Sequence, residues 1–543
     1  MAFSPTSKFF DPLNFLLRCS FVFLFASELE SRANAEVLFD EAKHVTLFAF
    51  DEVSIPHTQN LRLEMRSPKR HPSNPVVQRG NPGTPDAFGV QFYGSIIRER
   101  DKYRMWYVAF DDDVENKVAS ARWRAAYAES DDGVHWVKPN LGLVSYKGSK
   151  DNNLILIEPG PFGFVNLKVL ADPEDPNPDR RYKISTHIYF RHNTRLGSLA
   201  PFASADGLTW KLLTDAKPRK AEMLKEDLVL PAVHFEPCGG LYKWDGMYYI
   251  CGQNAMNAAR PYNGRVVRMY RSSDFVNWSQ TSSIGFIRTP QHTLLGPGHS
   301  REGEQNHEGI GVWNRRNVLL GITGRWHGAA EWKDVTVDLG FVVSNDGLQF
   351  REPMHEWTFL KRGDDGAWDQ GGLLQGQGFE NIGEETFIYY GAWDPRHWEN
   401  TPERGGVGIA ILPRDRFGDL VVEEKGKGPG DYQLPNITSE FVTAAIPIDS
   451  KAAHRLYLNA DGLGADAALK IELLTNTEIP IPGYSGKDAA VIRQNGFQTP
   501  IEWGGTKEIL NSAERVRIRV TFEGDRNREI RFSAMYLGSM PLH

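Results

Sequence analysis

The sequence predicts an all-β protein: a five-bladed β-propeller followed by a C-terminal β-sandwich. Three observations predict this fold: a motif that recurs five times, a second series of apolar segments with the same spacing, and a change of pattern after residue 422. Repeats are considered first because a tandem repeat determines the architecture of the chain that carries it.

The recurring motif has the form Ser-x-Asp-Gly-x-x-Trp. Its copies begin at Ser130, Ser204, Ser272 and Ser344, and a degenerate fifth copy is 413–417. The shared aspartates stand at 132, 206, 274, 346 and 415, so the intervals are 74, 68, 72 and 69 residues. Asp and Gly favour a tight turn, and Trp can fold back against it. We therefore interpret the motif as a structural turn between outer strands and not as a binding site.

Apolar segments typical of buried strands keep the same spacing. They are 103–108, 182–184, 247–250, 318–321 and 387–390. A unit of about 70 residues with four short strands cannot bury both faces of its sheet alone, whereas radial packing of such sheets covers them. Both series therefore predict five blades. A tandem array of unrelated β-domains is the alternative.

The C-terminal part has a different pattern. A linker rich in Gly, Lys and Glu covers 423–431, and the segments 468–473, 516–522 and 530–537 alternate apolar and polar residues. This period of two is typical of half-buried antiparallel strands. We expect the propeller to occupy residues 36–422 and a β-sandwich to occupy residues 432–543.

The first 35 residues resemble an export signal. Lys8 precedes apolar residues up to Ala26, and Ala33-Asn34-Ala35 offers a small-residue cleavage site. We therefore expect a signal peptide over 1–35 and a secreted or periplasmic protein; the alternative is an N-terminal tail. Beyond this segment, Cys238 and Cys251 remain, and they form either a disulfide across a hairpin or two separate thiols.

The composition limits the function. A net charge of −7 and a pI near 6.1 indicate no basic surface for nucleic acid, and no segment approaches a membrane span. Phosphate-binding loops and a Gly-x-Ser-x-Gly elbow are missing, so we expect no nucleotide cofactor. We expect the partner to be a carbohydrate. The oligomeric state stays open.

Five acidic residues recur at comparable positions before the second strand of each predicted blade. They are Asp86, Asp172, Glu236, Glu308 and Asp369. Inner strands line the axis of a propeller, so these carboxyl groups can converge there. Glycoside hydrolysis usually needs two such groups, one protonated to assist the leaving oxygen and one acting as nucleophile or base. Solvated surface acids are the alternative.

Blade four adds polar and aromatic residues suited to sugars, because aromatic rings stack on C–H groups while polar groups bind hydroxyls. The predicted substrate-binding residues are His307, Glu308, Arg325, Trp326, His327 and Asp369. A metal on His307, Glu304 and Glu308 is conceivable, but the spacing of a dedicated site is missing, so we expect none. Asp111-Asp112-Asp113 offers a second set of cation ligands, although an exposed loop explains it as well.

The segment 234–242, with Glu236-Pro237-Cys238 before a hairpin, resembles the Glu-Cys-Pro region of glycoside hydrolase family 32, and Ala171-Asp172-Pro173 resembles its Arg-Asp-Pro segment. The architecture is similar to the five-bladed superfamily of families 32, 43 and 68. This resemblance implies that Glu236 is the general acid and that Asp172 stabilises the transition state. The family's nucleophile motif is absent, and 83–89 is its nearest substitute by position.

The sequence thus predicts a secreted glycosidase that acts on an oligo- or polysaccharide. Glu236 would donate the proton, Asp86 would act as nucleophile or base, and Asp172 would orient hydroxyls and tune Glu236. Two alternatives stay open: a non-catalytic carbohydrate-binding propeller, and a glycoside phosphorylase with a basic pocket near the acid.

Overall fold

The computed structural model describes residues 44–540, except 114–121, 159–163, 165, 191–192, 215–238, 254–264, 289–304, 330, 356, 397–404, 424–437, 450–451 and 510–513. Its elements are β-strands and four 3₁₀ turns, η3 (Pro178–Arg180), η5 (Trp332–Asp334), η7 (Gly486–Asp488) and η8 (Asn527–Glu529). The all-β prediction is confirmed. No helix in the described part of the chain is long and apolar enough to cross a membrane.

The larger body consists of five consecutive units of antiparallel strands, with one parallel pair in the second unit. The first unit has β5 (Gly89–Glu99), β6 (Lys102–Phe110) and β7 (Trp123–Ser130), and the second has β8 (Leu156–Glu158), β9 (Lys168–Ala171), β10 (Tyr182–Phe190), β11 (Asn193–Ser204) and β12 (Thr209–Leu212). The parallel pair is β8 with β12. The third has β13 (Leu241–Trp244), β14 (Met247–Gln253), β15 (Val267–Ser272) and β16 (Ser283–Phe286). The fourth has β17 (Gln305–Asn314), β18 (Leu319–His327) and β19 (Thr336–Ser344), and the fifth has β20 (Leu373–Ile382), β21 (Glu385–Ala392) and β22 (Gly406–Pro413). The predicted apolar segments lie in the second strands, β6, β10, β14, β18 and β21, which are largely buried.

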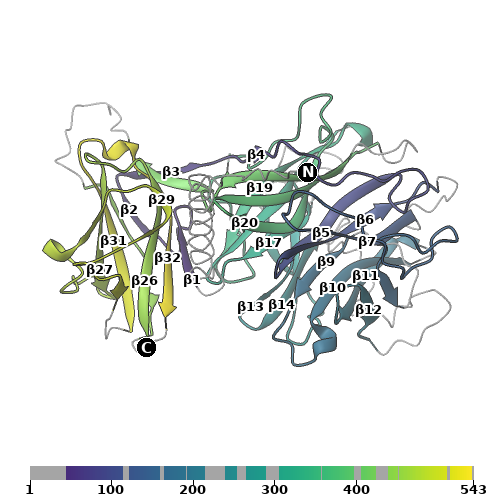
Figure 1. Cartoon of the computed structure of the whole chain (residues 1–543), viewed down its shortest axis with the longest axis horizontal. Coiled ribbons are helices and arrows are strands. Elements are labelled where there is room, and N and C mark those ends of the chain that lie inside the picture. The colour runs from purple at the N-terminus through teal and green to yellow at the C-terminus, as the bar shows by residue number, and fades with distance from the viewer. Residues whose placement is uncertain are drawn as a thin grey trace, which may run out of the picture.

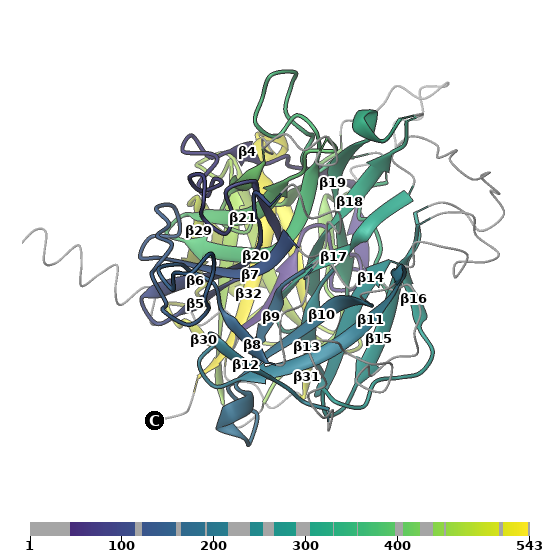
Figure 2. The same cartoon turned by 90° about the vertical axis from the view of Figure 1, so that its right-hand side faces the viewer.

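The inner strand of each unit is its first strand, except in the second unit, where it is β9. Each inner strand contacts the inner strands of the two neighbouring units, so the contacts form a closed cycle. β5 contacts β9, β9 contacts β13, β13 contacts β17, β17 contacts β20, and β20 contacts β5. These inner strands gather around the middle of the body in the view of Figure 2. The cyclic order agrees with the five blades that the repeat predicts, and we number the blades in chain order.

The N-terminal segment completes the last blade. The short strand β4 (Lys69–Arg70) pairs antiparallel with β22, and the backbone of Val76 and Val77 continues this pairing at Val407. Residues that precede blade one therefore form the outer strand of blade five. Hydrogen bonds between distant parts of the chain therefore close the cycle.

The smaller body is a sandwich of two sheets around one apolar core (Figure 1). One sheet has seven strands: β1 (His44–Phe48), β3 (Leu61–Met65), β23 (Gly418–Val422), β26 (Ala453–Asp461), β29 (Gly496–Pro500), β30 (Glu508–Ile509) and β32 (Arg531–Met540). The other has six: β2 (His57–Gln59), β24 (Glu440–Val442), β25 (Ile446–Pro447), β27 (Ala468–Thr475), β28 (Ala490–Ile492) and β31 (Arg515–Glu523). In β31 every second residue is buried, as the alternation of its sequence predicts.

The sandwich also contains N-terminal strands. β1 pairs with β32 from His44 opposite Gly538, β2 pairs with β24, and β3 pairs with β23. The sequence pattern assigned residues 36–422 to the propeller, whereas the strands within 44–65 and 418–422 lie in the sheets of the sandwich. Short strands separated from their partners by hundreds of residues leave no local signal, so sequence alone does not reveal this exchange.

A buried ion pair joins the two bodies. Arg315, in the β17–β18 turn, donates through Nη2 to Oδ2 of Asp415 at 3.0 Å and also contacts Oδ1. Tyr536 of the sandwich donates to the same Oδ2 at 2.9 Å. Burial alone would raise the pKa of Asp415, but the Arg315 charge holds it below its ordinary value. This contact fixes blades four and five against the sandwich.

The repeated motif forms the predicted turn. In the second copy, Ser204 Oγ accepts the backbone N–H of Gly207 at 2.8 Å, and Asp206 accepts the N–H groups of Leu208 and Thr209. The indole of Trp210 donates to the Gly207 carbonyl at 3.1 Å and is fully buried. Gly207 has a φ of 76°, which favours glycine. The motif therefore serves the fold.

Candidate active site

The inner strands of blades one, four and five each carry a β-bulge. The register shifts between Gln91 and Ser95, between His307 and Ile310, and between Gln375 and Phe379. Bulges redirect side chains and are frequent beside active sites. We call Tyr93, Lys168, Gln253, His307, Glu308 and Gln375 the axial cluster, because they meet where these bulges lie.

Glu308 stands at the bulge of β17. Its φ is 60°, and that of Gly309 is 91°, so both residues adopt left-handed backbone conformations. Such a conformation is uncommon for a residue other than glycine and persists only where the surrounding structure enforces it. The Glu308 side chain is 7% exposed. The bulge thus holds a buried carboxyl group at the axis.

Gln253, at the end of β14 in blade three, binds Glu308 in two ways. Its Nε2 donates to Glu308 Oε1 at 2.6 Å, and its Oε1 accepts the backbone N–H of Glu308 at 3.1 Å. One side chain therefore fixes both the carboxyl group and the backbone that carries it.

His307 lies between Tyr93 and Arg265. Its Nδ1 lies 2.7 Å from Arg265 Nη1, and its Nε2 lies 2.9 Å from the Tyr93 hydroxyl. A guanidinium only donates, so Nδ1 must be the acceptor, and the proton of the neutral ring is on Nε2. His307 then donates to Tyr93. The ring is held in one tautomer beside Glu308.

Aromatic rings surround His307. Trp326 lies 4.9 Å from it between ring centroids, and Trp393 lies 5.7 Å away. The two indoles lie 5.9 Å apart and belong, with Tyr93, to one apolar cluster. Aromatic rings grouped in this way suit the apolar C–H face of a sugar.

Lys168 and Gln375 join the inner strands across the axis. The fully buried Lys168 donates to the carbonyls of Gln375 at 2.8 Å and of Gly94 at 3.3 Å. Gln375 Nε2 in turn donates to the carbonyls of His307 and of Gly309, the latter at 3.0 Å. Bulged strands leave carbonyl groups without ladder partners, and these two side chains satisfy several of them.

Two predicted substrate-binding residues point away from this site. Arg325 neighbours Trp326 in β18, and neighbouring strand residues point to opposite faces. Its guanidinium donates to Glu352 at 2.9 Å and to Thr358 at 2.8 Å. His327 binds Asp338 at 3.1 Å, and although burial alone would raise the pKa of Asp338, this hydrogen bond helps to lower it. Both residues anchor the blade four periphery.

Asp86 and Asp369 have the same surroundings in blades one and five. Asp86 accepts a hydrogen bond from Tyr107 at 3.0 Å and pairs with Lys138; Asp369 accepts one from Tyr390 at 3.0 Å and pairs with Arg70 at 2.8 Å. Each aspartate is 1% exposed. Burial and the neighbouring carboxylate raise the pKa of Tyr107 and of Tyr390. We call these groups acid–tyrosine pairs.

Asp172 forms a third acid–tyrosine pair, with Tyr248 at 2.5 Å, and also binds Lys183 at 2.9 Å and Lys243 at 3.0 Å. Burial alone would raise the pKa of Asp172, but these three donors hold it below its ordinary value. The tyrosine and Lys243 come from blade three, so this pair joins two blades.

The structure does not bring Asp86 and Asp172 together. Leu167 donates to the Tyr93 carbonyl and Val169 donates to Ser95 Oγ, so β9 and β5 run side by side in the same direction. Asp86 precedes β5, whereas Asp172 follows β9. The two carboxyl groups therefore lie beyond opposite ends of adjoining strands. Asp172 therefore departs from the expectation that the acidic residues stand at comparable positions in their blades, because it follows its inner strand whereas Asp86 precedes its own.

Glu236 and Cys238 lie outside the described residues. Cys251 is a free, buried thiol, and burial raises its pKa to about 11. The hairpin turn is Asp245-Gly246, with Trp244 opposite Met247. In this register Gly240 is the backbone neighbour of Cys251.

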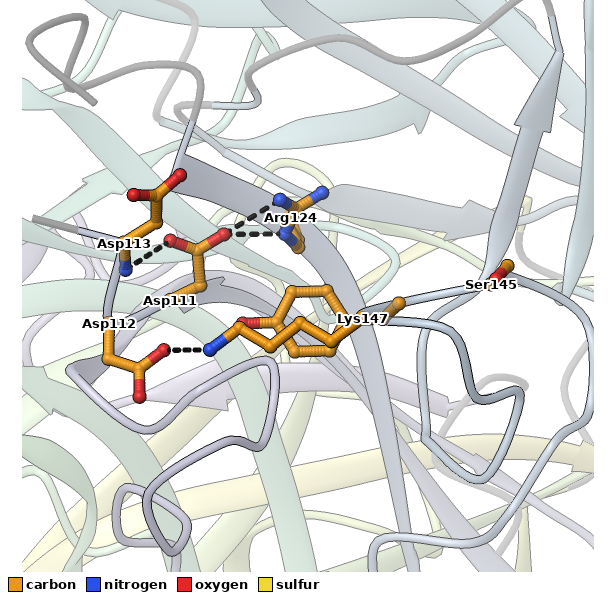
Figure 3. Close-up of a pocket in the computed structure, with 7 residues that line it drawn as sticks. Asp111, Asp112, Asp113, Arg124, Ser145 and Lys147 are labelled. Atoms are coloured by element: carbon orange, nitrogen blue, oxygen red, sulfur yellow. Dashed lines mark hydrogen bonds and ion pairs between the residues drawn. The ribbon is translucent and has the colours of Figure 1, made fainter. Parts of the chain in front are cut away.

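A pocket of about 420 Å³ lies at the rim of blade one (Figure 3). Asp111 binds Arg124 at 2.7 Å, and Asp112 binds Lys147 at 2.5 Å. Cations of the chain itself thus accompany two carboxylates of the Asp111–Asp113 run, and the described residues contain no group of three or more metal-ligating side chains placed to hold an ion. The run lies outside the strands, as a loop would, but Asp111 is buried and only Asp113 is exposed, so the expectation of an exposed loop is met only in part.

The sequence analysis missed Tyr93, Lys168, Gln253, Arg265, Gln375 and Trp393. A glycine follows a polar or aromatic residue at all three bulges, in Tyr93-Gly94, Glu308-Gly309 and Gln375-Gly376, and this pattern was an available signal. Gln253 and Arg265 carry no local signal, because they reach Glu308 and His307 from another blade.

No protein-family model matches the chain, and no curated protein sequence matches it significantly. Solved structures that resemble it include a glycosyl hydrolase from Bacteroides ovatus, with a TM-score of 0.41 and 16% identity over 65% of this chain and 95% of that one. Another is a structure described for the GH130 family of mannoside phosphorylases, which contains glycoside hydrolases that target β-1,2 mannosidic linkages in Candida mannan (0.40, 17%, 65% and 95%). A third is an N-acetylgalactosamine deacetylase from F. plautii (0.39, 15%, 65% and 96%). Likeness at this level supports no statement about activity, and membership of families 32, 43 or 68 stays a prediction.

Proposed function

We propose that this chain is a carbohydrate-active enzyme that cleaves a glycosidic bond at the axial cluster, with Glu308 as one of its two carboxyl groups. The observation that carries the proposal is Glu308 itself. It is a buried carboxyl group on a left-handed backbone, held by Gln253 and next in sequence to His307, whose ring packs against Trp326 and Trp393. A side chain held against its backbone preference points to a functional constraint.

Glu236 is the proposed partner and proton donor. Gly239 lies against Cys251 and the backbone of Ile310, which is two residues from Glu308. Glu236 precedes Gly239 by three residues, a chain length of about 11 Å at most. Glu308 would then act as nucleophile or as base on a water, and the separation of the two carboxyl groups would set the stereochemical outcome.

Asp86, Asp172 and Asp369 receive structural roles in this proposal. Each is nearly inaccessible and already binds a tyrosine hydroxyl and a cation. A catalytic carboxyl group must instead reach the substrate. We assign these three residues to the positioning of the strands that surround the axis.

The test is turnover by Glu308→Gln on a panel of neutral and acidic oligosaccharides, read as released reducing sugar. We expect loss of at least a thousandfold in kcat with sugar binding retained, the size expected for a group directly involved in the chemistry. Glu331→Gln, exposed on the same blade and paired with Lys333, is the matched control and should keep full activity. Full turnover by Glu308→Gln contradicts the proposal.

A second candidate is a non-catalytic carbohydrate-binding protein. The separation of Asp86 from Asp172 favours it, since the carboxyl groups that the sequence suggested do not act on one bond. This candidate predicts saturable binding of a glycan by the wild-type chain without any product, and binding that is lost when Trp326 is changed to Ala.

Export is also part of the proposal and rests on the N-terminal residues alone. We expect the secreted or periplasmic chain to begin at Glu36. N-terminal sequencing of protein recovered from outside the cytoplasm tests this, and an intact Met1 in that fraction contradicts it.

A further inference from the structure

Arg265 is held rigidly at the axial cluster. It precedes β15, and its guanidinium carbon lies 3.9 Å from the ring centroid of Trp326. Its Nη1 donates to His307 Nδ1 at 2.7 Å, and its backbone N–H donates to Gln305 Oε1 at 3.0 Å. The indole and the imidazole fix the plane of the guanidinium, so the direction of its remaining N–H groups is fixed as well.

The charge of Arg265 has no carboxylate partner within ion-pair distance among the described residues, and this sets it apart from other arginines of the propeller. Arg325 and Arg288 share Glu352, each at 2.9 Å, and Arg124 binds Asp111 at 2.7 Å. Arg265 is half-buried, and the described side chains that its guanidinium contacts, His307 and Trp326, carry no negative charge. A partly desolvated cation without an anion is costly unless a ligand supplies the anion.

We propose that Arg265 binds an oxyanion of the ligand, either the carboxylate of an acidic sugar or a phosphate. The planar fork of a guanidinium matches both groups through paired N–H bonds. His307 links Arg265 to the neighbouring Glu308, so the anion would be bound next to the bond that Glu308 acts on. The saccharide part of this inference rests on the proposed function, whereas the anion part stands on Arg265 alone.

Calorimetric titration at fixed ionic strength tests the inference with four probes: trigalacturonate, a glucuronate disaccharide, neutral galactotriose, and inorganic phosphate. We expect the wild-type chain to bind at least one anionic probe, and Arg265→Met to bind it at least tenfold more weakly. Arg271→Met, exposed on β15, is the matched control and should bind as the wild type does. Binding of uronate and not phosphate identifies an acidic sugar as the source, and the reverse identifies phosphate.

Three outcomes overturn the inference: no binding of any anionic probe, equal binding of galactotriose and trigalacturonate without phosphate binding, or unchanged binding by Arg265→Met. Arg265→Lys keeps the positive charge and loses only the paired N–H groups of the guanidinium. It should weaken binding less than Arg265→Met does, and this difference distinguishes loss of the anion contact from misfolding. Glu308→Gln separates the two proposals. Full turnover by this variant would refute the proposed function and would not affect the conclusion about anion binding by Arg265. If turnover is lost, the variant should still bind the anionic probe.

Discussion

Gln253 and Glu308 hold each other through two hydrogen bonds that run in opposite directions. The backbone N–H of Glu308 can only donate, so Gln253 Oε1 must face it. The NH₂ group of Gln253 must then face Glu308 Oε1. The orientation of the Glu308 carboxyl group is thereby fixed. Gln253 is a positioning residue, because it acts through Glu308.

Gln253→Met keeps the length of the side chain and removes both hydrogen bonds. A hydrogen bond to a charged group contributes about 1.5–3 kcal/mol, so we expect kcat to fall by about ten- to a hundredfold with little change in KM. Steady-state kinetics on the best substrate of the panel measures both constants. Gln280→Met, exposed in blade three, is the control; a change in KM alone would show that Gln253 contacts substrate instead.

Asp369→Asn distinguishes a structural acid from a catalytic one. The change weakens the bonds to Arg70 and Tyr390, so we expect a loss of about 1–3 kcal/mol in the free energy of unfolding and unchanged kcat at a temperature where the chain is folded. Denaturant unfolding and turnover measure the two effects. Tyr390→Phe should show a smaller loss of the same kind. If the Asp369→Asn chain is stable but inactive, Asp369 belongs to the active site and is not merely structural.

The aspartates of the repeated turns should make the stability of the fold sensitive to acid. Burial alone would raise the pKa of Asp206, Asp274 and Asp346, but backbone N–H groups and a serine hydroxyl lower each of them, that of Asp274 to about 2. A lowered folded-state pKa gives stability that is present above the unfolded value, near 4, and is lost as the pH falls through the folded value. We expect the melting temperature to drop steeply between about pH 4 and pH 2. Asp274→Asn should lower the melting temperature at pH 7 and flatten this dependence; an unchanged slope would contradict the assignment.

Arg315→Met should destabilise the junction between propeller and sandwich. The change leaves the buried Asp415 without its cation, and breaking such a pair from one side costs about 3–5 kcal/mol. Arg315→Met combined with Asp415→Leu removes both charges and should be less damaging than the single change. A calorimetric scan measures this, and equal losses in the single and double variants would show that the pair contributes nothing specific.

The sequence predicted the repeating part of the fold because each blade carries the same local chemistry. The turn tolerates exceptions: Phe275 replaces the glycine and still adopts a φ of 68°, since its ring is buried against Trp278. The site was predicted less well. Equal spacing placed Asp172 with Asp86, but β9 has only four residues and Asp172 follows it. Spacing along a chain does not reveal at which end of a strand a residue lies.

The chain folds into two bodies that share one segment. Residues 44–65 supply strands to the sandwich, and residues 69–77 supply the outer strand of blade five. Until β22 and β32 have been synthesised, these strands have no partners and the cycle of blades is open. The chain can thus complete neither body during most of its synthesis. It must keep its first strands from pairing wrongly, and both bodies close only when the last hundred or so residues arrive.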